Sequence, residues 1–447
     1  MKRYFFIAAM AILAVGCQKT EIQNEVQTPI GFSTEVGKQT KAIVQNGQNG
    51  KAAYLTDQPF GVYAYGHQGT ATPTPVMDNV EVSYTKATTG DNPTPEKWAV
   101  STDQTVTTKY YWPNDPNTTL NFYAYSPAQP KTGVNSKKAA HQELTGTISH
   151  SEDTGLKLTD YVHSNMYVDF MVATPVLNAT YSDPNGDGAN GGDAGVVPVD
   201  FGHKLTQVNF VVKIADTESY PNVDFKINSI VLNNIVSNGT YSYAYTPATT
   251  GTDGTPVEAT VTEGWQSATS KATASYKIYP ATKANVPATL SEGDNGYSYR
   301  APELENVNTT NPEETEVTVI LRTDYRTRTQ IKENTTERDL TAAENPGKSF
   351  STTPVTMIPQ TLTKTDATPD VDQSFTISYT ISGTGVATET VVKTFDFYDA
   401  TATSVPTWGI NKRITYVLTI SLNEITFSPI VTNWTEEEGT YVDPANN

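Results

Sequence analysis

Hydrophobic and polar residues alternate along many short segments of this chain. The clearest are 59–65 (PFGVYAY), 119–125 (TLNFYAY), 207–214 (QVNFVVKI) and 414–422 (ITYVLTISL). In an extended chain, successive side chains point to opposite faces, so each segment has one apolar face and one mixed face. This pattern predicts antiparallel strands whose sheets pack together in pairs. Helical periodicity is almost absent.

The spacing of these strands predicts an all-β fold of two transthyretin-like or Greek-key β-sandwich domains in tandem. Long polar loops separate the runs, and this is typical of sandwiches rather than propellers. The most loop-like stretch is 182–195, but a strand resumes at Val196, so we place the domain boundary at the polar spacer that follows residue 214. The predicted domains are 42–215 and 216–447, each of ordinary size.

Composition supports strands and turns and excludes several functions. Of the 447 residues, 37% are hydrophobic and 17% charged, and the net charge of −18 opposes binding to nucleic acid. One Cys excludes an intrachain disulfide, and the five His have no metal-ligand spacing. Without a GxSxG or Cys nucleophile motif, the chain is predicted to be no enzyme and to need no cofactor. The paired carboxylates of a glycosidase are not excluded, because they come together from distant positions and leave no motif in the sequence.

The N-terminus has the organisation of an export signal. Lys2 and Arg3 precede an apolar run at 4–15, which is too short to span a membrane and fits a signal peptide. Gly16 and Cys17 follow it directly, in an arrangement similar to the lipobox of bacterial lipoproteins. We therefore expect residues 1–16 to be removed and the Cys17 thiol to be acylated. An ordinary signal peptide with a chance Cys is the alternative.

Several segments together resemble the fimbrillin-like lipoproteins, the pilin subunits of type V pili in gut and oral anaerobic bacteria. They are the Cys17 tether, 30–42, 109–127, 199–214, 357–362 and 407–434. The resemblance implies two transthyretin-like domains, export as a lipoprotein to the outer membrane and cell surface, and a place in a pilus. It also implies that a trypsin-like protease removes the tether and first strand, after which subunits polymerise.

The segment 30–36 (IGFSTEV) is suited to being that removable strand, because Ile30, Phe32, Thr34 and Val36 share one face if it is extended. A sandwich that loses an edge strand exposes an apolar groove and unpaired backbone groups, which a neighbour's segment can fill. Lys38 and Lys41 follow the strand, so residues 17–41 are the predicted tether and removable strand. The alternative is a permanent edge strand with solvated lysines.

Two further motifs have a simple and a functional interpretation. Asp183, Asn185, Asp187 and Gly188 match the start of a calcium-binding loop, but the final acidic ligand is missing, so a plain turn is favoured. The pairs Tyr63/Tyr65 and Tyr123/Tyr125 could stack on sugars, although their alternation favours cross-strand packing.

The predicted function is a structural pilus subunit that is trimmed at its N-terminus, polymerises by strand exchange and supports adhesion. Its predicted partners are other pilus subunits, a trypsin-like processing protease and a host or bacterial surface receptor. The alternatives are a lipid-anchored glycan-binding surface protein and a pilus anchor subunit that keeps its lipid. The sequence does not distinguish a stalk subunit from a tip subunit, because residues 425–434 could serve a neighbour as a donor strand or complete their own domain.

Overall fold

The structure is a computed structural model, and its described residues fall into many segments separated by gaps. Among these residues every regular element is a strand, and no helix occurs that could cross a lipid bilayer. The described residues are 28–36, 58–85, 97–100, 110–129, 144–164, 166, 168–188, 193–215, 223–250, 255–267, 272–279, 316–322, 328–333, 336–339, 349–352, 354–362, 372–398, 407–422 and 424–434.

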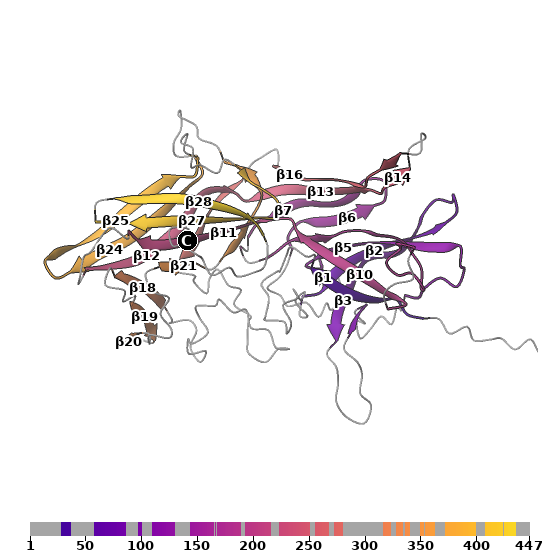
Figure 1. Ribbon diagram of the computed structural model, residues 1–447, viewed down its shortest axis with the longest axis horizontal. Coiled ribbons are helices and arrows are strands. Elements are labelled where there is room, and N and C mark those ends of the chain that lie inside the picture. The colour runs from indigo at the N-terminus through magenta and orange to yellow at the C-terminus, as the bar shows by residue number, and fades with distance from the viewer. Residues whose placement is uncertain are drawn as a thin grey trace, which may run out of the picture.

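An eight-stranded sheet forms one end of the elongated molecule, at the right of Figure 1. Its order is β2-β3-β4-β1-β10-β8-β5-β9, and β2 also pairs with β5. Because of that extra pairing the sheet closes on itself as a barrel, with β9 outside the ring. The strands are β1 (Gly31–Val36), β2 (Phe60–Gln68), β3 (Thr74–Thr85), β4 (Lys97–Val100), β5 (Thr118–Ser126), β8 (Met171–Ala173), β9 (Val176–Ala179) and β10 (Val196–His203).

Alternation along the strands fills the inside of this barrel with apolar side chains. Val62 on β2 and Phe122 on β5 point inward and pack with Phe32, Phe60 and other buried residues. A cavity of about 10 Å³ remains between Phe32, Val62 and Phe122, which is space for roughly one water molecule. The barrel is therefore a packed core rather than a pore.

A four-stranded sheet covers the outer face of β2 and β5. Its order is β16-β13-β7-β6. The tyrosines that alternate with the inward-facing residues lie between the two layers: Tyr63 and Tyr125 are buried there together with Tyr241. The strands are β6 (Thr147–Ser151), β7 (Gly155–Val162), β13 (Asn238–Thr246) and β16 (Thr260–Ser267).

The other end of the molecule is a sandwich of two sheets, as Figure 1 shows at the left. One sheet has the order β21-β11-β27-β28, with β22 also paired to β11, and the other has the order β20-β19-β18-β12-β24-β25, with β17 paired to β12. The first consists of β11 (Thr206–Ile214), β21 (Ser349–Ser351), β22 (Val355–Met357), β27 (Lys412–Ile420) and β28 (Ile425–Asn433). The second consists of β12 (Val223–Val236), β17 (Thr273–Tyr279), β18 (Glu316–Arg322), β19 (Arg328–Glu333), β20 (Thr336–Asp339), β24 (Ser374–Gly383) and β25 (Val386–Asp396).

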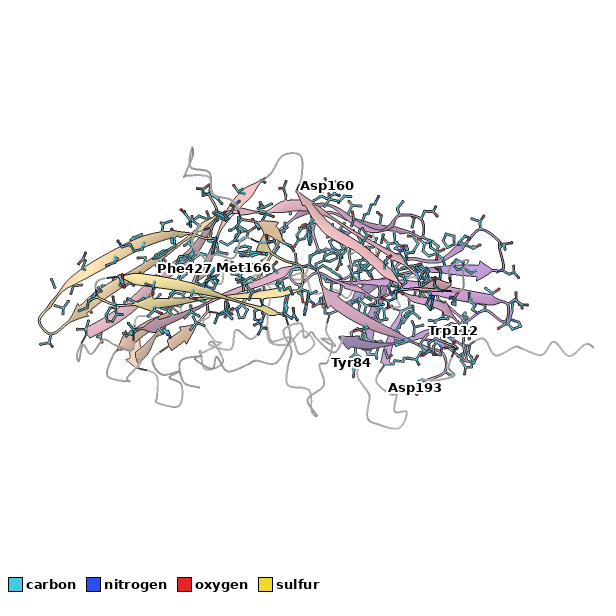
Figure 2. The ribbon with its side chains drawn as sticks, turned by 45° about the horizontal axis from the view of Figure 1, so that its top comes forward. Tyr84, Trp112, Asp160, Met166, Asp193 and Phe427 are labelled. Atoms are coloured by element: carbon cyan, nitrogen blue, oxygen red, sulfur yellow. The ribbon has the colours of Figure 1, made fainter. Side chains whose placement is uncertain are left out.

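Aromatic rings from both sheets meet in the core of this sandwich. Phe210 on β11 lies 5.0 Å from Phe375 on β24 and 5.3 Å from Tyr416 on β27, measured between ring centroids. Met166 and Phe427 also lie in or against this core (Figure 2). Two small ladders, β14 (Thr249–Thr250) with β15 (Pro256–Val257) and β23 (Gln360–Thr361) with β26 (Thr407–Trp408), complete the pairing.

The chain crosses between the two ends twice through short connections. Strand β10 belongs to the barrel and β11, which follows after two residues, to the distal sandwich; β12 then lies in the sandwich and β13 on the barrel. The predicted boundary at residue 216 stays a prediction, and strands from each side of it pair with the opposite half. The all-β class is confirmed, and the layers agree with tandem sandwiches; the transthyretin-like detail stays a prediction.

Candidate functional site

The predicted removable strand is β1, and it is one of the strands that form the barrel. It runs parallel to β10, with Gly31 opposite Val196 and Val36 opposite Phe201. Ile30, just before the strand, is 3% exposed and Phe32 is 4% exposed, whereas Thr34 is half-buried. Val36 is described by its backbone alone. The predicted alternation thus places Ile30 and Phe32 together in the barrel core, and β1 lies between two strands rather than at a sheet edge.

The two sides of β1 are paired to very different extents. On the β10 side the ladder runs through every residue of Gly31–Val36. On the β4 side the described ladder consists of one residue pair, Phe32 with Trp98. Among the described residues, most of the backbone pairing of β1 therefore comes from β10.

The residues just before β1 are held by a loop from across the barrel. The Ile30 amide donates to the Tyr110 carbonyl at 2.9 Å, and the Trp112 amide donates to the Thr28 carbonyl at 3.1 Å. The Gly195 carbonyl accepts from both the Gly31 amide and the Trp112 indole N–H, each at 3.0 Å.

Gly195 itself needs to be glycine. Its φ of 79° lies in the left-handed region, and a Cβ there would come within 2.8 Å of the Tyr181 ring.

Phe32 packs in the apolar core of the barrel. Its ring lies edge-on to Phe60 at 5.9 Å and to Phe122 at 6.0 Å between centroids. Burying such a side chain stabilises the fold by roughly 1.5–3 kcal/mol. Without β1, this pocket and the inner edges of β10 and β4 would be left open. The result is an apolar slot flanked by unpaired backbone groups, which is the chemistry that recognises an extended segment.

The predicted modification and processing residues lie outside the described residues. These are Cys17, Lys38 and Lys41. Lys38 is two residues beyond the end of β1, and all three remain predictions.

The predicted calcium loop forms a turn in which Asp183 is bonded by the backbone. One oxygen of its carboxylate accepts from the Gly186 amide at 3.1 Å, and the other accepts from the Gly188 amide at 2.9 Å. The Asn185 amide donates to Asp187 at 2.7 Å. Among the described residues no group of three or more His, Cys, Asp or Glu is arranged to hold a metal ion. This geometry fits the favoured interpretation, a plain turn.

The tyrosine pairs pack between layers instead of lining an open surface. Tyr63 is 3% exposed and Tyr125 is fully buried. Tyr65 and Tyr123 are partly buried and lie edge-on at 6.1 Å. These contacts agree with cross-strand packing, the favoured interpretation.

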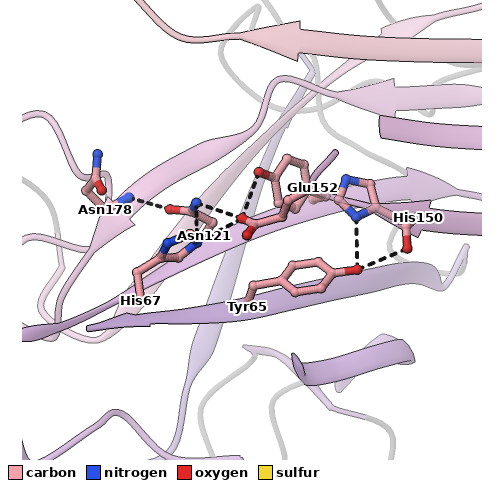
Figure 3. Close-up of polar contacts among 7 residues, drawn as sticks. Tyr65, His67, Asn121, His150, Glu152 and Asn178 are labelled. Carbon is pink, nitrogen blue, oxygen red and sulfur yellow. Dashed lines mark hydrogen bonds and ion pairs between the residues drawn. The ribbon is translucent and has the colours of Figure 1, made fainter. Parts of the chain in front are cut away.

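Sequence reasoning missed a polar network at one end of this tyrosine layer (Figure 3). Glu152, in the turn between β6 and β7, accepts through one carboxylate oxygen from the Asn121 amide at 2.8 Å and the Tyr123 hydroxyl at 3.2 Å. The same oxygen lies 2.9 Å from Nε2 of His67, and Tyr65 donates to the His150 carbonyl at 3.0 Å. These contacts tie the β6–β7 hairpin to β2 and β5.

Burial sets the protonation of the rings in this network. Desolvation lowers the pKa of His150 to about 4, against a smaller opposing effect from the Glu152 charge. Burial likewise raises the pKa of Tyr123 above its ordinary value. His150 is therefore neutral at pH 7, and its tilted contact with Tyr123, 3.9 Å between ring centroids and 34° between ring planes, joins two uncharged rings.

The C-terminal strand completes its own sandwich. Strand β28 pairs with β27 along its whole length, from Ile425 opposite Ile420 to Asn433 opposite Lys412. Trp434, which follows, is 1% exposed and stacks on the His203 ring at 3.7 Å and 3°. Residues 425–434 were expected either to complete their own domain or to be donated to a neighbour. In this structure they complete their own sandwich, and Trp434 connects the distal sheet to the end of β10.

Comparison with known proteins gives one family and several solved structures. A crystal structure of a fimbrial protein from Bacteroides vulgatus is 16% identical, covers 84% of this chain and 93% of its own, and has a TM-score of 0.45. A candidate cell adhesion protein from Bacteroides uniformis is 14% identical, with coverages of 91% and 98% and a TM-score of 0.40. A C-terminally truncated tip fimbrial protein, Mfa3, from Porphyromonas gingivalis is 10% identical, with coverages of 84% and 94% and a TM-score of 0.24.

No curated protein matches the sequence. The fimbrillin-like family model matches residues 40–323, which is more than half of the chain. On that match, the chain belongs to the fimbrillin-like family.

Proposed function

We propose that this chain is a structural subunit of a cell-surface pilus that polymerises by strand exchange and supports adhesion. In this proposal it is exported as a lipoprotein through Cys17, trimmed after Lys38 or Lys41, and assembled with other pilus subunits. Membership of the fimbrillin-like family supports a pilus or adhesion role and a structural, non-enzymatic protein at the cell surface. The processing protease and a surface receptor remain proposed partners.

The position of β1 is the observation on which the proposal depends. It precedes every other described strand and is buried through Ile30 and Phe32, and among the described residues its complete ladder is the one with β10. Cleavage after Lys41 would separate it from the rest of the chain without breaking any other described strand. A segment from a neighbouring subunit could then occupy the same slot, pair with β10 and place an apolar side chain where Phe32 lies.

Limited trypsin digestion of the purified full chain tests this proposal. We expect cleavage after Lys38 or Lys41, loss of 30–36, and an SDS-resistant ladder of species that start at Gln39 or Ala42. A K38Q/K41Q variant is the matched control, and it should stay uncut at this site and monomeric. An excess of a free IGFSTEV peptide should block the ladder, whereas a scrambled peptide should not.

A chain that loses residues up to 41 and remains monomeric would contradict strand exchange. The N-terminal residue of the protein recovered from cells separates the remaining alternatives. A lipidated Cys17 on a single species of unchanged size would indicate the anchor subunit or a free-standing surface protein.

A further inference from the structure

The strands at the ends of the sheets differ greatly in how much free edge they present. Among the described residues the other end strands are all shorter than β25: β16 has 8 residues with Gly264 among them, and β17, which pairs with β12 alone, has 7. Strand β20 has 4 residues, β6 has 5 and β21 has 3, and β28 contains Pro429, which has no N–H to donate. Strand β25 has 11 residues, and neither Pro nor Gly occurs between Val386 and Asp396. It is the longest free edge in the described part of the chain.

Strand β25 also exposes apolar surface beside that edge. Val392 is 61% exposed, the highest fraction among the exposed large hydrophobic residues. On the same outward face, Thr394 and Thr390 form hydrogen bonds to Thr376 and Thr380 of β24, at 2.9 and 3.1 Å. These contacts hold the outer face of the hairpin in a regular ladder. A long, regular edge with an exposed apolar residue favours pairing with another strand.

The charges along β25 complement those of a second β25 that runs in the opposite direction. Glu389 and Lys393 are both exposed and lie at equal distances on either side of Val391. In antiparallel pairing centred on Val391, Glu389 of each copy lies opposite Lys393 of the other. Thr390 then lies opposite Val392. Parallel pairing in register would instead place Glu389 opposite Glu389 and Lys393 opposite Lys393, which is unfavourable.

Both charged groups are available for such pairs. Within the part of the chain that the structure describes, neither Glu389 nor Lys393 takes part in an ion pair. Each lies on the face of β25 that bears Val391 and Phe395, which pack against the sandwich core, so the backbone between them is held in a fixed position.

We propose that β25 is a lateral interface between two copies of this chain, which pair antiparallel across a two-fold axis at Val391. The outer sheet of the distal sandwich then continues from one copy into the next. Figure 1 places β25 at the end of the molecule opposite to β1. Pairing through β25 therefore does not use the slot of β1, and a chain that keeps β1 is equally able to pair.

Sedimentation velocity of the purified full chain over a range of concentrations tests the interface. Keeping residues 1–41 excludes polymerisation through the β1 slot, so the two kinds of association are distinguished. We expect a reversible dimer. The K393E variant sets Glu389 opposite a second glutamate twice in each dimer, and its dissociation constant should rise roughly tenfold or more. The double variant E389K/K393E restores opposite charges and should bring the constant back close to that of the wild type.

The matched control is K226E, which changes the net charge equally at an exposed position of the same sheet, on the inner strand β12. It should leave the dissociation constant unchanged. Circular dichroism should be the same for all four proteins. A wild-type chain that stays monomeric at its solubility limit would overturn the proposal. So would a dimer that K393E does not weaken, or one that the double variant fails to restore.

Discussion

Two parallel strand pairs, one at each end of the molecule, differ in what lies on their far side. In the barrel, β1 pairs with β10; in the distal sandwich, β27 pairs with β11 from Arg413 opposite Gln207 to Ile420 opposite Ile214. Strand β27 also pairs along its full length with β28, whereas β1 contacts β4 in one described pair. Both strands carry buried side chains, and among the described residues only β27 has a complete ladder on both sides.

This difference indicates what would make a strand removable. Burial is not the distinction, because Phe32 and Tyr416 are both almost inaccessible to solvent. The distinction is in the extent of the described ladders and in the position in the chain: β27 is followed directly by its partner β28, while β1 precedes all other described strands. A first strand whose one complete described ladder is with a single neighbour can leave, once the chain is cut after it, without breaking another described strand.

The largest expected effect is the loss of an aromatic ring from the fixed pair. Phe210→Ala removes a buried ring that contacts Phe375 and Tyr416, and the free energy of unfolding should fall by about 4 kcal/mol. Urea unfolding followed by circular dichroism measures this fall. A loss below about 1 kcal/mol would mean that the sandwich repacks easily and is no more fixed than the barrel.

Acid should destabilise the fold through two buried histidines. His150 lies against the Tyr123 ring, and His163 is hydrogen-bonded to the Thr356 carbonyl of β22 in the distal sandwich. Burial lowers the pKa of His150 and of His163 to about 4 in the folded chain. Each ring binds its proton more readily when unfolded, so its contribution is complete above pH 6.5 and is lost as pH falls from 6.5 towards 4.

The loss should reach about 3 kcal/mol for each ring at pH 4. Urea unfolding at pH 7 and pH 4.5 checks this, and H150Q and H163Q should each show a smaller difference between the two pH values. If acid destabilises the variants as much as the wild type, the histidines are not the cause.

Truncation of the β1 anchor should act locally. Phe32→Ala is expected to cost about 2–3 kcal/mol, and its effect should be concentrated on the exchange protection of the β1 and β10 amides. Hydrogen exchange read by mass spectrometry measures where protection falls. The same substitution should speed trypsin cleavage after Lys38 or Lys41. Equal loss of protection in β11 and β27 would show that β1 is not a separate unit.

The smallest effect concerns the loop that holds the start of β1. Trp112→Phe keeps a buried ring but removes the indole N–H that donates to the Gly195 carbonyl. We expect a loss of about 1 kcal/mol, with faster exchange at the Gly31 amide, which shares that carbonyl. Trp98→Phe is a matched ring substitution on β4 and should leave the Gly31 amide unchanged.

Local alternation in the sequence was enough to predict the strands themselves. Residues 31–36, 207–214 and 412–420 are strands, and the tyrosines of 59–65 and 119–125 face a second layer, as alternation favours. The partners of these strands could not be predicted. Parallel pairing of β1 with β10 joins residues 165 positions apart, and no local pattern encodes it. The Glu152 network has the same origin, since it forms when β2, β5 and the β6–β7 turn meet.

The segment from Val196 to Ile214, in which two residues separate strands β10 and β11, has a mechanical consequence. Strand β10 pairs with β1 and strand β11 pairs with β27, so this one stretch of backbone spans both ends of the molecule. Strands β11 and β27 run close to the long axis in Figure 1. Tension along that axis would shear the β11–β27 ladder, loading its hydrogen bonds together instead of one after another. The force that one subunit withstands is then set by the rate at which this ladder breaks.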